Sequence, residues 1–487
     1  MRFAAFFSAF LFAANASAAI DWNADLDTLR TEVPKVHPNA FHAITKEAWE
    51  ASIAKLRADA SNLPPHKVAA EIGRIMASIG DGHTRLTFPI DPKAGFFSGH
   101  STTKMPADPA LQFRQLPVRF AWLSNGLVIT AAANRDLVGH RVSRIGTMTP
   151  EEAYKAMAPL AHGDNEAMRR AIASDYFAVP ELLNAAGISP SKDSVTIDGT
   201  KLDALPFDTD APWLPKSDPR HFWFEQRGKS VYFVFNEVNN EEKESLRDFA
   251  ARLFKFIDDH KTDTLIIDLR ANSGGNNGLL QPLVHGLIRR PGLRVFALIG
   301  PRTFSAAVDF ALQLEQNTST VFVGEPTGGK PNNYGDSRKI TLPSSGMTVR
   351  VSTLYWQKSD PRDFRDAIPP HLTVIPSSTD LASHRDLALQ TTTHIADGIR
   401  KKGTLDGAWT GIITIEWHRI PVTLDAHHLT IPDLGVKDYA IEQPHFTIAS
   451  TEGPLEFDLH PGAGVITGTM TGLGRVFPVL LTKSSAP

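Results

Sequence analysis

Apolar residues recur at helical spacing in the first part of the chain. Between residues 68 and 79 they fall three and four positions apart, which predicts an amphipathic helix. A second helix is predicted over residues 49–56, where the apolar side chains again share one face. Gly80 follows the stronger pattern and is a residue type that commonly ends a helix. We therefore expect residues 20–92 to form a helical region.

Strand and helix patterns alternate in the middle of the chain. The strand-like apolar runs are residues 231–235, 264–269, 294–299 and 320–324, and helical patterns at 246–257, 278–288 and 307–316 separate them. This alternation predicts βαβ units, and uninterrupted apolar strands predict a sheet that is covered on both faces. A hairpin is predicted from residues 337–342 and 347–355. We expect residues 219–379 to form one α/β domain.

The remaining segments are predicted to be β-rich or linking. Residues 93–218 begin with a loop rich in Gly, Pro, Ser and Asp and continue as a mixed inserted module. Its short elements are predicted at 118–122, 126–131 and 150–157. A helix within 380–404 is predicted as a linker. Residues 405–487 alternate polar and apolar side chains between turns, which predicts a separate antiparallel β domain, either a barrel or a sandwich.

The chain of 487 residues has the composition of an ordinary soluble protein, with 42% hydrophobic and 21% charged residues. Its net charge of −3 argues against a nucleic-acid partner, because nucleic-acid-binding domains carry a strong basic excess. The absence of cysteine excludes a thiol nucleophile and thiolate metal ligands. No grouping of His, Asp and Glu has metal-ligand spacing, so we expect neither a metal nor a cofactor. The sequence does not indicate the oligomeric state.

The first residues of the chain have the features of a secretory signal peptide, which we place at residues 1–19. Arg2 is followed by an apolar run over residues 3–14 and by a small-residue cleavage pattern at 16–18. The run is shorter than the ~20 apolar residues that span a bilayer, and no other stretch approaches that length. We therefore expect an exported protein, periplasmic or extracellular, without a transmembrane segment.

One serine lies in a setting that suits catalysis. Ser305 falls between the predicted strand 294–299 and the predicted helix 307–316. Serine is also a common helix N-cap, which is the structural interpretation of this position. Free N–H groups at a helix N-terminus favour a developing anion, so the same turn suits a nucleophilic hydroxyl. Lys330 follows in the sequence and is a candidate base, although most lysines are solvated surface charges.

Two further turns supply candidate groups for the same reaction. Gly274 and Gly275 follow the predicted strand 264–269, and two glycines let backbone N–H groups approach a ligand closely. Such donors would stabilise an oxyanion. His83 lies in a turn after a predicted helix, and histidine titrates near neutral pH, so His83 is a second candidate base.

The residue types alone do not decide between the two bases. Lys330 would need its pKa lowered by several units from ~10.4, through burial or a neighbouring cation. His83 needs little shift, but it needs an acceptor that orients its ring. The candidate acceptors are Asp363 and Asp360.

Four motifs that contain these residues occur in order along the chain. They are Asp81-Gly82-His83-Thr84, Asp268-Leu269-Arg270-Ala271-Asn272-Ser273-Gly274-Gly275, Thr303-Phe304-Ser305-Ala306 and Gly324-Glu325-Pro326-Thr327-Gly328-Gly329-Lys330. Together they resemble the carboxyl-terminal processing, or tail-specific, serine protease family, including its tricorn-like branch. The resemblance covers residues 25–376. It implies a crotonase-like (ClpP-like) α/β core, with a PDZ-like module over residues 93–218 that helps to present the carboxyl terminus of a substrate.

The resemblance also implies roles for individual residues. Ser305 would be the nucleophile, and the Ala306 N–H would join Gly274 or Gly275 in an oxyanion hole. The position of Lys330 supplies the base in the Ser/Lys members, and that of His83 does so in the tricorn-like members. This chain departs from the Ser/Lys pattern, because Ala307 and Pro331 stand where those enzymes usually have Ser and Gly.

We therefore expect a serine-type endopeptidase that hydrolyses peptides or proteins through an acyl-enzyme on Ser305, with His83 or Lys330 as the general base. Two alternatives use the same scaffold. One is a serine esterase with the same nucleophile. The other is a non-catalytic binding protein, in which the carboxyl-terminal β domain holds an apolar ligand.

Overall fold

The computed structural model describes residues 20–88, 106, 108–208, 210–216, 218–401, 403–415, 418–450, 453–472 and 474–483. The predicted signal peptide and most of the predicted loop after residue 90 lie outside the described residues. Within the described part, no helix is both long enough and apolar enough to cross a bilayer.

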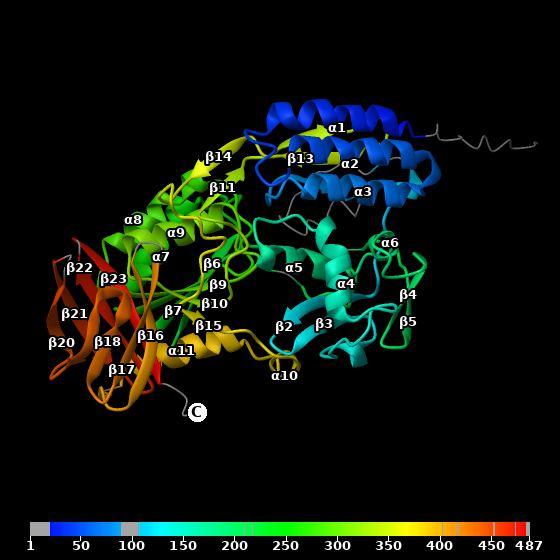
Figure 1. Cartoon of the computed structure of the whole chain (residues 1–487). Helices are drawn as coiled ribbons and strands as arrows, with labels where there is room; N and C mark the ends of the chain where they lie inside the picture. The colour runs from blue at the N-terminus through cyan, green and yellow to red at the C-terminus, as the bar shows by residue number, and fades with distance from the viewer. Residues whose placement is uncertain are drawn as a thin grey trace, which may run out of the picture.

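Three helices form the first part of the molecule, shown in blue in Figure 1. They are α1 (Trp22–Val36), α2 (Lys46–Asp59) and α3 (Pro65–Ala77). The apolar faces predicted for the second and third helices are buried, and Gly80 ends the segment with a φ of +86°. The helical prediction for this region is confirmed.

The next region is a mixture of short strands and helices. Its elements are β2 (Val118–Leu123), β3 (Gly126–Ala132), α4 (Pro150–Met157), α5 (Glu166–Tyr176), α6 (Pro180–Ala185), β4 (Ser194–Ile197) and β5 (Thr200–Asp203). The strands form two separate hairpins, β2–β3 and β4–β5. One apolar core joins this region to the three amino-terminal helices. The region therefore packs as part of that layer, and α5 and α6 are additions that the sequence pattern did not predict.

A six-stranded sheet forms the centre of the molecule (Figure 1). Its strands, in spatial order, are β15 (Leu372–Thr373), β10 (Val321–Gly324), β9 (Arg294–Ile299), β8 (Thr264–Asp268), β7 (Ser230–Phe235) and β6 (Phe222–Arg227). All neighbours run parallel except β6 and β7. The carboxyl ends of β8, β9 and β10 therefore lie at one edge, where α/β proteins place their sites.

Helices cover both faces of this sheet, as the apolar strands predicted. The helices α7 (Leu246–Asp259), α8 (Gln281–Ile288) and α9 (Ala306–Asn317) pack on one face. On the other face, Ile266 and Phe296 of the sheet share an apolar core with Leu389 and Ile395 of α11 (Leu387–Ile399). The predicted linker helix is interrupted, because α10 (Ser378–Ala382) ends before Asp386 caps α11.

Two small sheets flank the central sheet. One pairs β11 (Asn332–Gly335) with β14 (Leu354–Gln357). The other has the order β1–β13–β12, made from β1 (Arg85–Thr87), β13 (Thr348–Val351) and β12 (Arg338–Thr341). The predicted hairpin is confirmed as β12–β13, but its second arm ends early because residues 354–357 pair with β11. The partnership of β1 with β13 joins the amino-terminal region to the α/β region.

The last part of the chain is an antiparallel sheet of eight strands that curls into a near-barrel (Figure 1). The strands are β16 (Ala408–Ile415), β17 (His418–Asp425), β18 (His428–Ile431), β19 (Val436–Ala440), β20 (His445–Ser450), β21 (Gly453–Pro461), β22 (Val465–Gly472) and β23 (Arg475–Lys483). Their apolar side chains form a core of their own. The antiparallel β prediction is confirmed, and Val465 and Leu480 also pack against the central sheet.

Candidate active site

Ser305 lies in the turn between β9 and α9, at the N-cap position of the helix. Its φ of 53° and ψ of −126° are unusual for a residue with a side chain. Its hydroxyl makes no capping hydrogen bond with the helix. A serine whose only task is capping would use its oxygen on an N–H of the first turn. The turn instead points the hydroxyl away from the helix, and backbone strain of this kind is concentrated at functional sites.

His83 is the hydrogen-bond partner of the Ser305 hydroxyl. The His83 Nε2 lies 3.0 Å from the Ser305 Oγ. His83 is buried, and its ring packs against the Phe304 ring at 4.4 Å between centroids. The turn that carries His83 leads directly into β1, and the pairing of β1 with β13 fixes its position beside the α/β region. This distance is short enough for direct proton transfer.

A buried carboxylate holds the turn that carries His83. The Asp81 Oδ1 accepts hydrogen bonds from the N–H groups of His83 and Thr84, at 2.9 and 2.7 Å, and from the Ser352 hydroxyl at 2.8 Å. The Asp81 Oδ2 lies 2.9 Å from the His37 Nε2. Because the His37 Nδ1 accepts the N–H of Asn39, the His37 Nε2 is the nitrogen that carries a proton and donates it to Asp81.

Burial and charge set the protonation states of this group. Burial alone would raise the pKa of Asp81, but its hydrogen bond and electrostatic interaction with His37 lower it to about 2. Burial lowers the pKa of His83 to about 4, although the Asp81 charge opposes this shift. The Tyr334 backbone also opposes the shift as a hydrogen-bond acceptor, although within the described part of the chain no acceptor has good hydrogen-bond geometry for the buried His83 Nδ1. At neutral pH the imidazole is therefore uncharged and able to accept a proton.

Three backbone N–H groups near Ser305, those of Gly274, Gly275 and Ala306, are candidates for an oxyanion hole. The N–H of Gly274 donates to the Asn272 Oδ1 at 2.9 Å, so it is already used. The N–H groups of Gly275 and Ala306 have no acceptor among the described residues, and both residues line the same cavity as Ser305. Of the two predicted glycines, the structure therefore leaves Gly275 as the donor available to a ligand.

Close approach of the backbone explains why glycine occupies position 274. A Cβ on Gly274 would lie 2.6 Å from the Ser305 Cβ and 2.9 Å from the Ala306 nitrogen. Its φ of +109° is also unfavourable for any other residue. The buried Asn272 holds this loop by donating to the Phe235 carbonyl, at 2.8 Å, and by accepting the Gly274 N–H.

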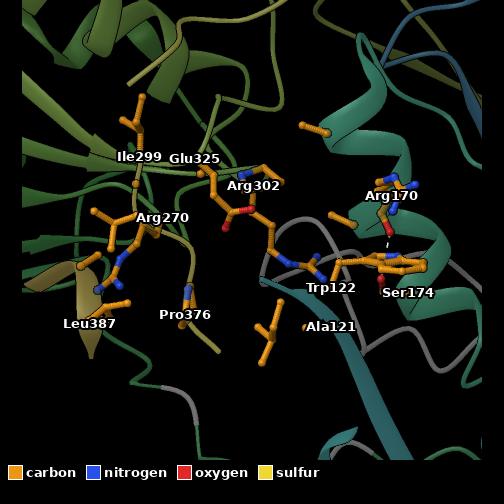
Figure 2. A pocket seen from close by; sticks show the side chains of 18 of the residues that line it. Ala121, Trp122, Arg170, Ser174, Arg270, Ile299, Arg302, Glu325, Pro376 and Leu387 are labelled. Carbon is orange, nitrogen blue, oxygen red and sulfur yellow. Dashed lines mark hydrogen bonds between the residues drawn. The ribbon is translucent and has the colours of Figure 1, made fainter. Parts of the chain in front are cut away.

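Ser305 opens into a cavity of about 350 Å³. Besides the groups above, the cavity is lined by polar or aromatic side chains, which are Asn276, Asn277, Asp309, Asn333, Asp336, Trp356 and Lys358, and by Pro331. This volume is within the usual range of ligand sites. A larger cavity of about 610 Å³ lies between β2, α5 and the carboxyl ends of β9 and β10 (Figure 2). Its labelled lining includes Trp122, Arg302 and Glu325.

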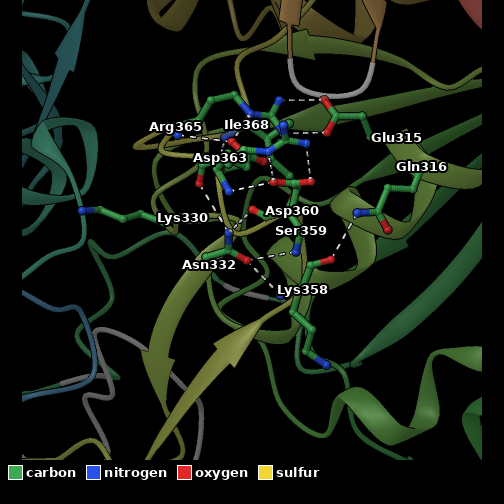
Figure 3. Close-up of polar contacts among 12 residues, drawn as sticks. Glu315, Gln316, Lys330, Asn332, Lys358, Ser359, Asp360, Asp363, Arg365 and Ile368 are labelled. Atoms are coloured by element: carbon green, nitrogen blue, oxygen red, sulfur yellow. Dashed lines mark hydrogen bonds and ion pairs between the residues drawn. The ribbon is translucent and has the colours of Figure 1, made fainter. Parts of the chain in front are cut away.

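The structure does not bring Lys330 to Ser305. The Lys330 ammonium lies 3.3 Å from the Asp366 carboxylate and is partly exposed. In Figure 3 its side chain extends away from the neighbouring polar cluster. The interval between serine and lysine in the sequence could not reveal this direction, because the segment between them includes all of α9 and β10.

Asp363 and Asp360 also lie apart from the His83 ring, contrary to the interpretation made from the sequence. The Asp363 carboxylate pairs with Arg365, which in turn pairs with Glu315 at 2.8 Å (Figure 3). Asp360 pairs with Arg362. The carboxylate that positions His83 is instead Asp81, which binds the backbone of the turn rather than the ring. Its place two residues before His83 was a usable signal, because Asp side chains commonly accept N–H groups two and three residues onward.

Sequence reasoning also missed Asp164, which bridges two segments of the site. The Asp164 Oδ1 accepts the Gly82 N–H at 2.7 Å, and its Oδ2 accepts the Lys330 N–H at 3.4 Å. Burial raises the pKa of Asp164 to about 7, and the charge of Asp81 acts in the same direction. The adjacent Asn165 donates to the Thr327 carbonyl at 2.9 Å. No local pattern marks these contacts, because Asp164 reaches across from a different region of the fold.

Within the described residues, no cluster of three or more His, Cys, Asp or Glu side chains could hold a metal ion.

Comparison with known proteins gives a structural relationship. No family model matches the sequence, and no curated protein does. Mature CPAF matches the structure with a TM-score of 0.51 at 12% identity, covering 78% of this chain and 96% of CPAF. The chain has the CPAF fold. The complex of CPAF with lactacystin matches with a TM-score of 0.52 at 11% identity, covering 78% of this chain and 97% of the other.

The photosystem II D1 C-terminal processing protease is also among the matching structures, with a TM-score of 0.36 at 12% identity, covering 74% of this chain and 94% of that protease. The CPAF matches support the resemblance at the level of the fold alone.

Proposed function

We propose that the protein is a serine peptidase that cleaves peptide bonds through an acyl-enzyme on Ser305. The observation that carries the proposal is the 3.0 Å separation of the His83 Nε2 and the Ser305 Oγ, two atoms that come from distant parts of the chain. The unusual backbone of Ser305 and its unused capping hydroxyl support the same role. The fold of CPAF is consistent with this chemistry.

In the proposed reaction, acyl transfer proceeds in the following steps. The Ser305 oxygen attacks the substrate carbonyl while His83 accepts the hydroxyl proton. The negative charge that develops on the carbonyl oxygen is stabilised by the N–H groups of Gly275 and Ala306, which need no reorganisation. His83 then gives its proton to the leaving amine, the C–N bond breaks, and a water molecule hydrolyses the ester in the same way.

Asp81 acts on His83 through charge and position. Its carboxylate holds the backbone of the His83 turn, and its negative charge stabilises the imidazolium that forms when His83 accepts the proton. His37 and Ser352 fix the carboxylate in place. In this proposal His83 is the general base and Lys330 is a structural residue of the neighbouring loop.

The finer features of the architecture are part of the same proposal. We take the six-stranded sheet and its helices as a crotonase-like core, and the region of β2, β3 and α5 as a PDZ-like module. The cavity of about 610 Å³ between this region and the sheet supports such a module, because it places an apolar hollow beside the carboxyl edge of the sheet. We also propose export, on the strength of the amino-terminal sequence, and sequencing the amino terminus of the mature protein tests it.

The nucleophile is tested by covalent labelling with a fluorophosphonate probe. We expect the wild type to be labelled and Ser305→Ala to be unlabelled. Ser273→Ala is the matched control, because Ser273 lies in the loop beside Ser305 and has no assigned part in the reaction. Equal labelling of Ser305→Ala and the wild type would overturn the assignment. Mass spectrometry of a peptide mixture incubated with both proteins then shows whether the labelled serine cleaves peptide bonds.

A further inference from the structure

Three cations stand in a row across the small sheet that begins beside His83. In the β1–β13 pair, Arg85 lies directly opposite Arg350, and in the β13–β12 pair Arg350 lies directly opposite Lys339. Directly opposite residues of antiparallel neighbours project from the same face of a sheet. The adjacent positions Leu86 and Val349 are buried in the core, so the three cations occupy the other face. We call Arg85, Arg350 and Lys339 the cationic row.

The row forms no ion pair within the described part of the chain, although the charge of the buried Asp81 acts on Arg85. The Arg85 guanidinium donates to the carbonyls of Gly82 and His83, at 3.1 and 3.4 Å, and the Arg350 guanidinium donates to the Ser337 hydroxyl at 3.3 Å. Neither arginine nor Lys339 forms an ion pair with a described carboxylate. Like charges directly opposite one another destabilise a sheet, so this arrangement has a cost that a bound anion would remove.

Burial makes the lack of an ion pair among the described residues more notable. Burial, and then the charge of Arg350, lower the pKa of Arg85 to about 10, and burial lowers that of Arg350. Both arginines are partly buried, and charged side chains withdrawn from water are usually paired. A further unpaired group lies on the same face, because the Thr87 Oγ1 is buried without a hydrogen-bond partner in the described part of the chain. Thr87 is two positions beyond Arg85 and could donate to the same anion.

The row is close to the proposed catalytic base. Arg85 follows His83 by two residues and contacts its carbonyl. The charges of Arg85 and Arg350 both lower the pKa of His83. An anion on the row would therefore lie close to His83, and it would weaken the effect of both cations on the pKa of His83.

We propose that the cationic row is a subsite for a carboxylate of the peptide substrate, which makes the enzyme selective for acidic peptides. This inference rests on the proposed peptidase function. Guanidinium groups match a carboxylate in geometry as well as charge, and Lys339 adds a mobile cation at the exposed end of the row. The carboxylate comes from an Asp or Glu side chain or from the carboxyl terminus of the peptide, and matched peptides distinguish the two sources.

The test compares Arg350→Gln with Arg338→Gln. Arg338 immediately precedes Lys339 in β12, but it lies opposite Val351 on the other face of the sheet and approaches Glu32 at 3.9 Å. The control therefore removes the same charge from the same small sheet without touching the row. A peptide cleaved by the wild type is identified from a defined peptide mixture. It is then synthesised with each acidic residue as Glu or Gln, and with the carboxyl terminus as free acid or amide.

We expect Arg350→Gln to lower kcat/KM for the acidic peptide by about ten- to a hundredfold, the range for a lost charge-assisted hydrogen bond. The neutral peptide should change little, and Arg338→Gln should keep the wild-type preference. A loss confined to the Glu/Gln pair identifies a side-chain subsite, and one confined to the acid/amide pair identifies a terminal carboxylate. An unchanged preference in Arg350→Gln would overturn the inference.

Two further measurements keep the inference separate from the proposed function. Fluorophosphonate labelling of every variant reports on Ser305 regardless of substrate preference. If the wild type cleaves no peptide, the defined mixture is passed over immobilised wild type and Arg350→Gln. Stronger retention of acidic peptides by the wild type supports the subsite, and equal retention overturns it. If Arg350→Gln does not fold, Lys339→Gln at the exposed end of the row takes its place in both measurements.

Discussion

Gly274 and Ser305 approach so closely that an added Cβ on Gly274 would lie 2.6 Å from the Ser305 Cβ. Gly274→Ala must therefore displace either the nucleophile or the Gly275 N–H, in addition to straining a backbone with a φ of +109°. We expect the rate of acylation to fall by about 10²–10³, as it does when an oxyanion donor is lost. Stopped-flow labelling of the active serine measures this rate. The control is Gly292→Ala, because a Cβ on Gly292 meets no atom within 4 Å. Similar rates for the two variants would contradict this geometry.

The pH dependence of the reaction should report the buried state of His83. The base must be uncharged to accept a proton, and burial lowers its pKa to about 4. We therefore expect kcat/KM to rise as the pH increases through about 4, and this limb to be complete at neutral pH. A rate that continued to rise towards the ordinary lysine pKa of ~10.4 would favour Lys330 as the base.

Substitution of the two candidate bases separates them directly. We expect His83→Ala to lower acylation by about 10²–10⁴, the usual contribution of a general base. Lys330→Ala removes only a partly exposed ion pair with Asp366, so its effect on the rate should be small. Loss of acylation in Lys330→Ala together with full activity in His83→Ala would contradict the geometry of the site.

Local sequence signals located the turns of the site, and they did so for physical reasons. Ser305 and the Gly274–Gly275 pair lie where strands end and helices or loops begin, and hydrophobic periodicity marks those boundaries well. The parallel order of the sheet brings the turns after β8 and β9 together. The alternation of strands and helices predicted the sheet, whereas the resemblance to tail-specific proteases implied that the glycine pair lies beside Ser305.

The partners of His83 could not be predicted in the same way. The approach of His83 to Ser305 depends on the pairing of β1 with β13, which joins the amino-terminal region to the α/β region and leaves no periodic signal. Asp363 was a reasonable acceptor by residue type, but a neighbouring cation, Arg365, holds it elsewhere. Asp164 was missed because a buried carboxylate that binds backbone N–H groups has no sequence motif.

Asp81 should make the stability of the protein depend on acidity. Its pKa is lowered from 3.8 to about 2 in the folded state, so ionised Asp81 stabilises the fold above pH 4. That contribution is lost as the pH falls from about 4 to 2, and it amounts to on the order of 2 kcal/mol. Urea unfolding at pH 6 and pH 2 measures most of the loss. Asp81→Asn should lack this part of the pH dependence, and an unchanged dependence in the variant would show that other carboxyl groups cause it.

Asp164 should make the protein less stable as the pH rises, which is opposite to the effect of Asp81. Burial raises its pKa from 3.8 to about 7, so the folded protein keeps a proton there that the unfolded chain releases. The free energy of unfolding should therefore fall as the pH rises from about 4 to 7, by on the order of 4 kcal/mol. Asp164→Asn cannot ionise and keeps an oxygen for the Gly82 N–H, so its unfolding free energy should be nearly constant over this range. Urea unfolding at pH 5 and pH 8 compares it with the exposed control Asp136→Asn, which should behave as the wild type does. If the unfolding free energy of Asp164→Asn fell as much as that of the wild type, Asp164 would not be the cause of the fall. Asp164 would then be ionised in the folded protein over this pH range, stabilised by its two N–H donors.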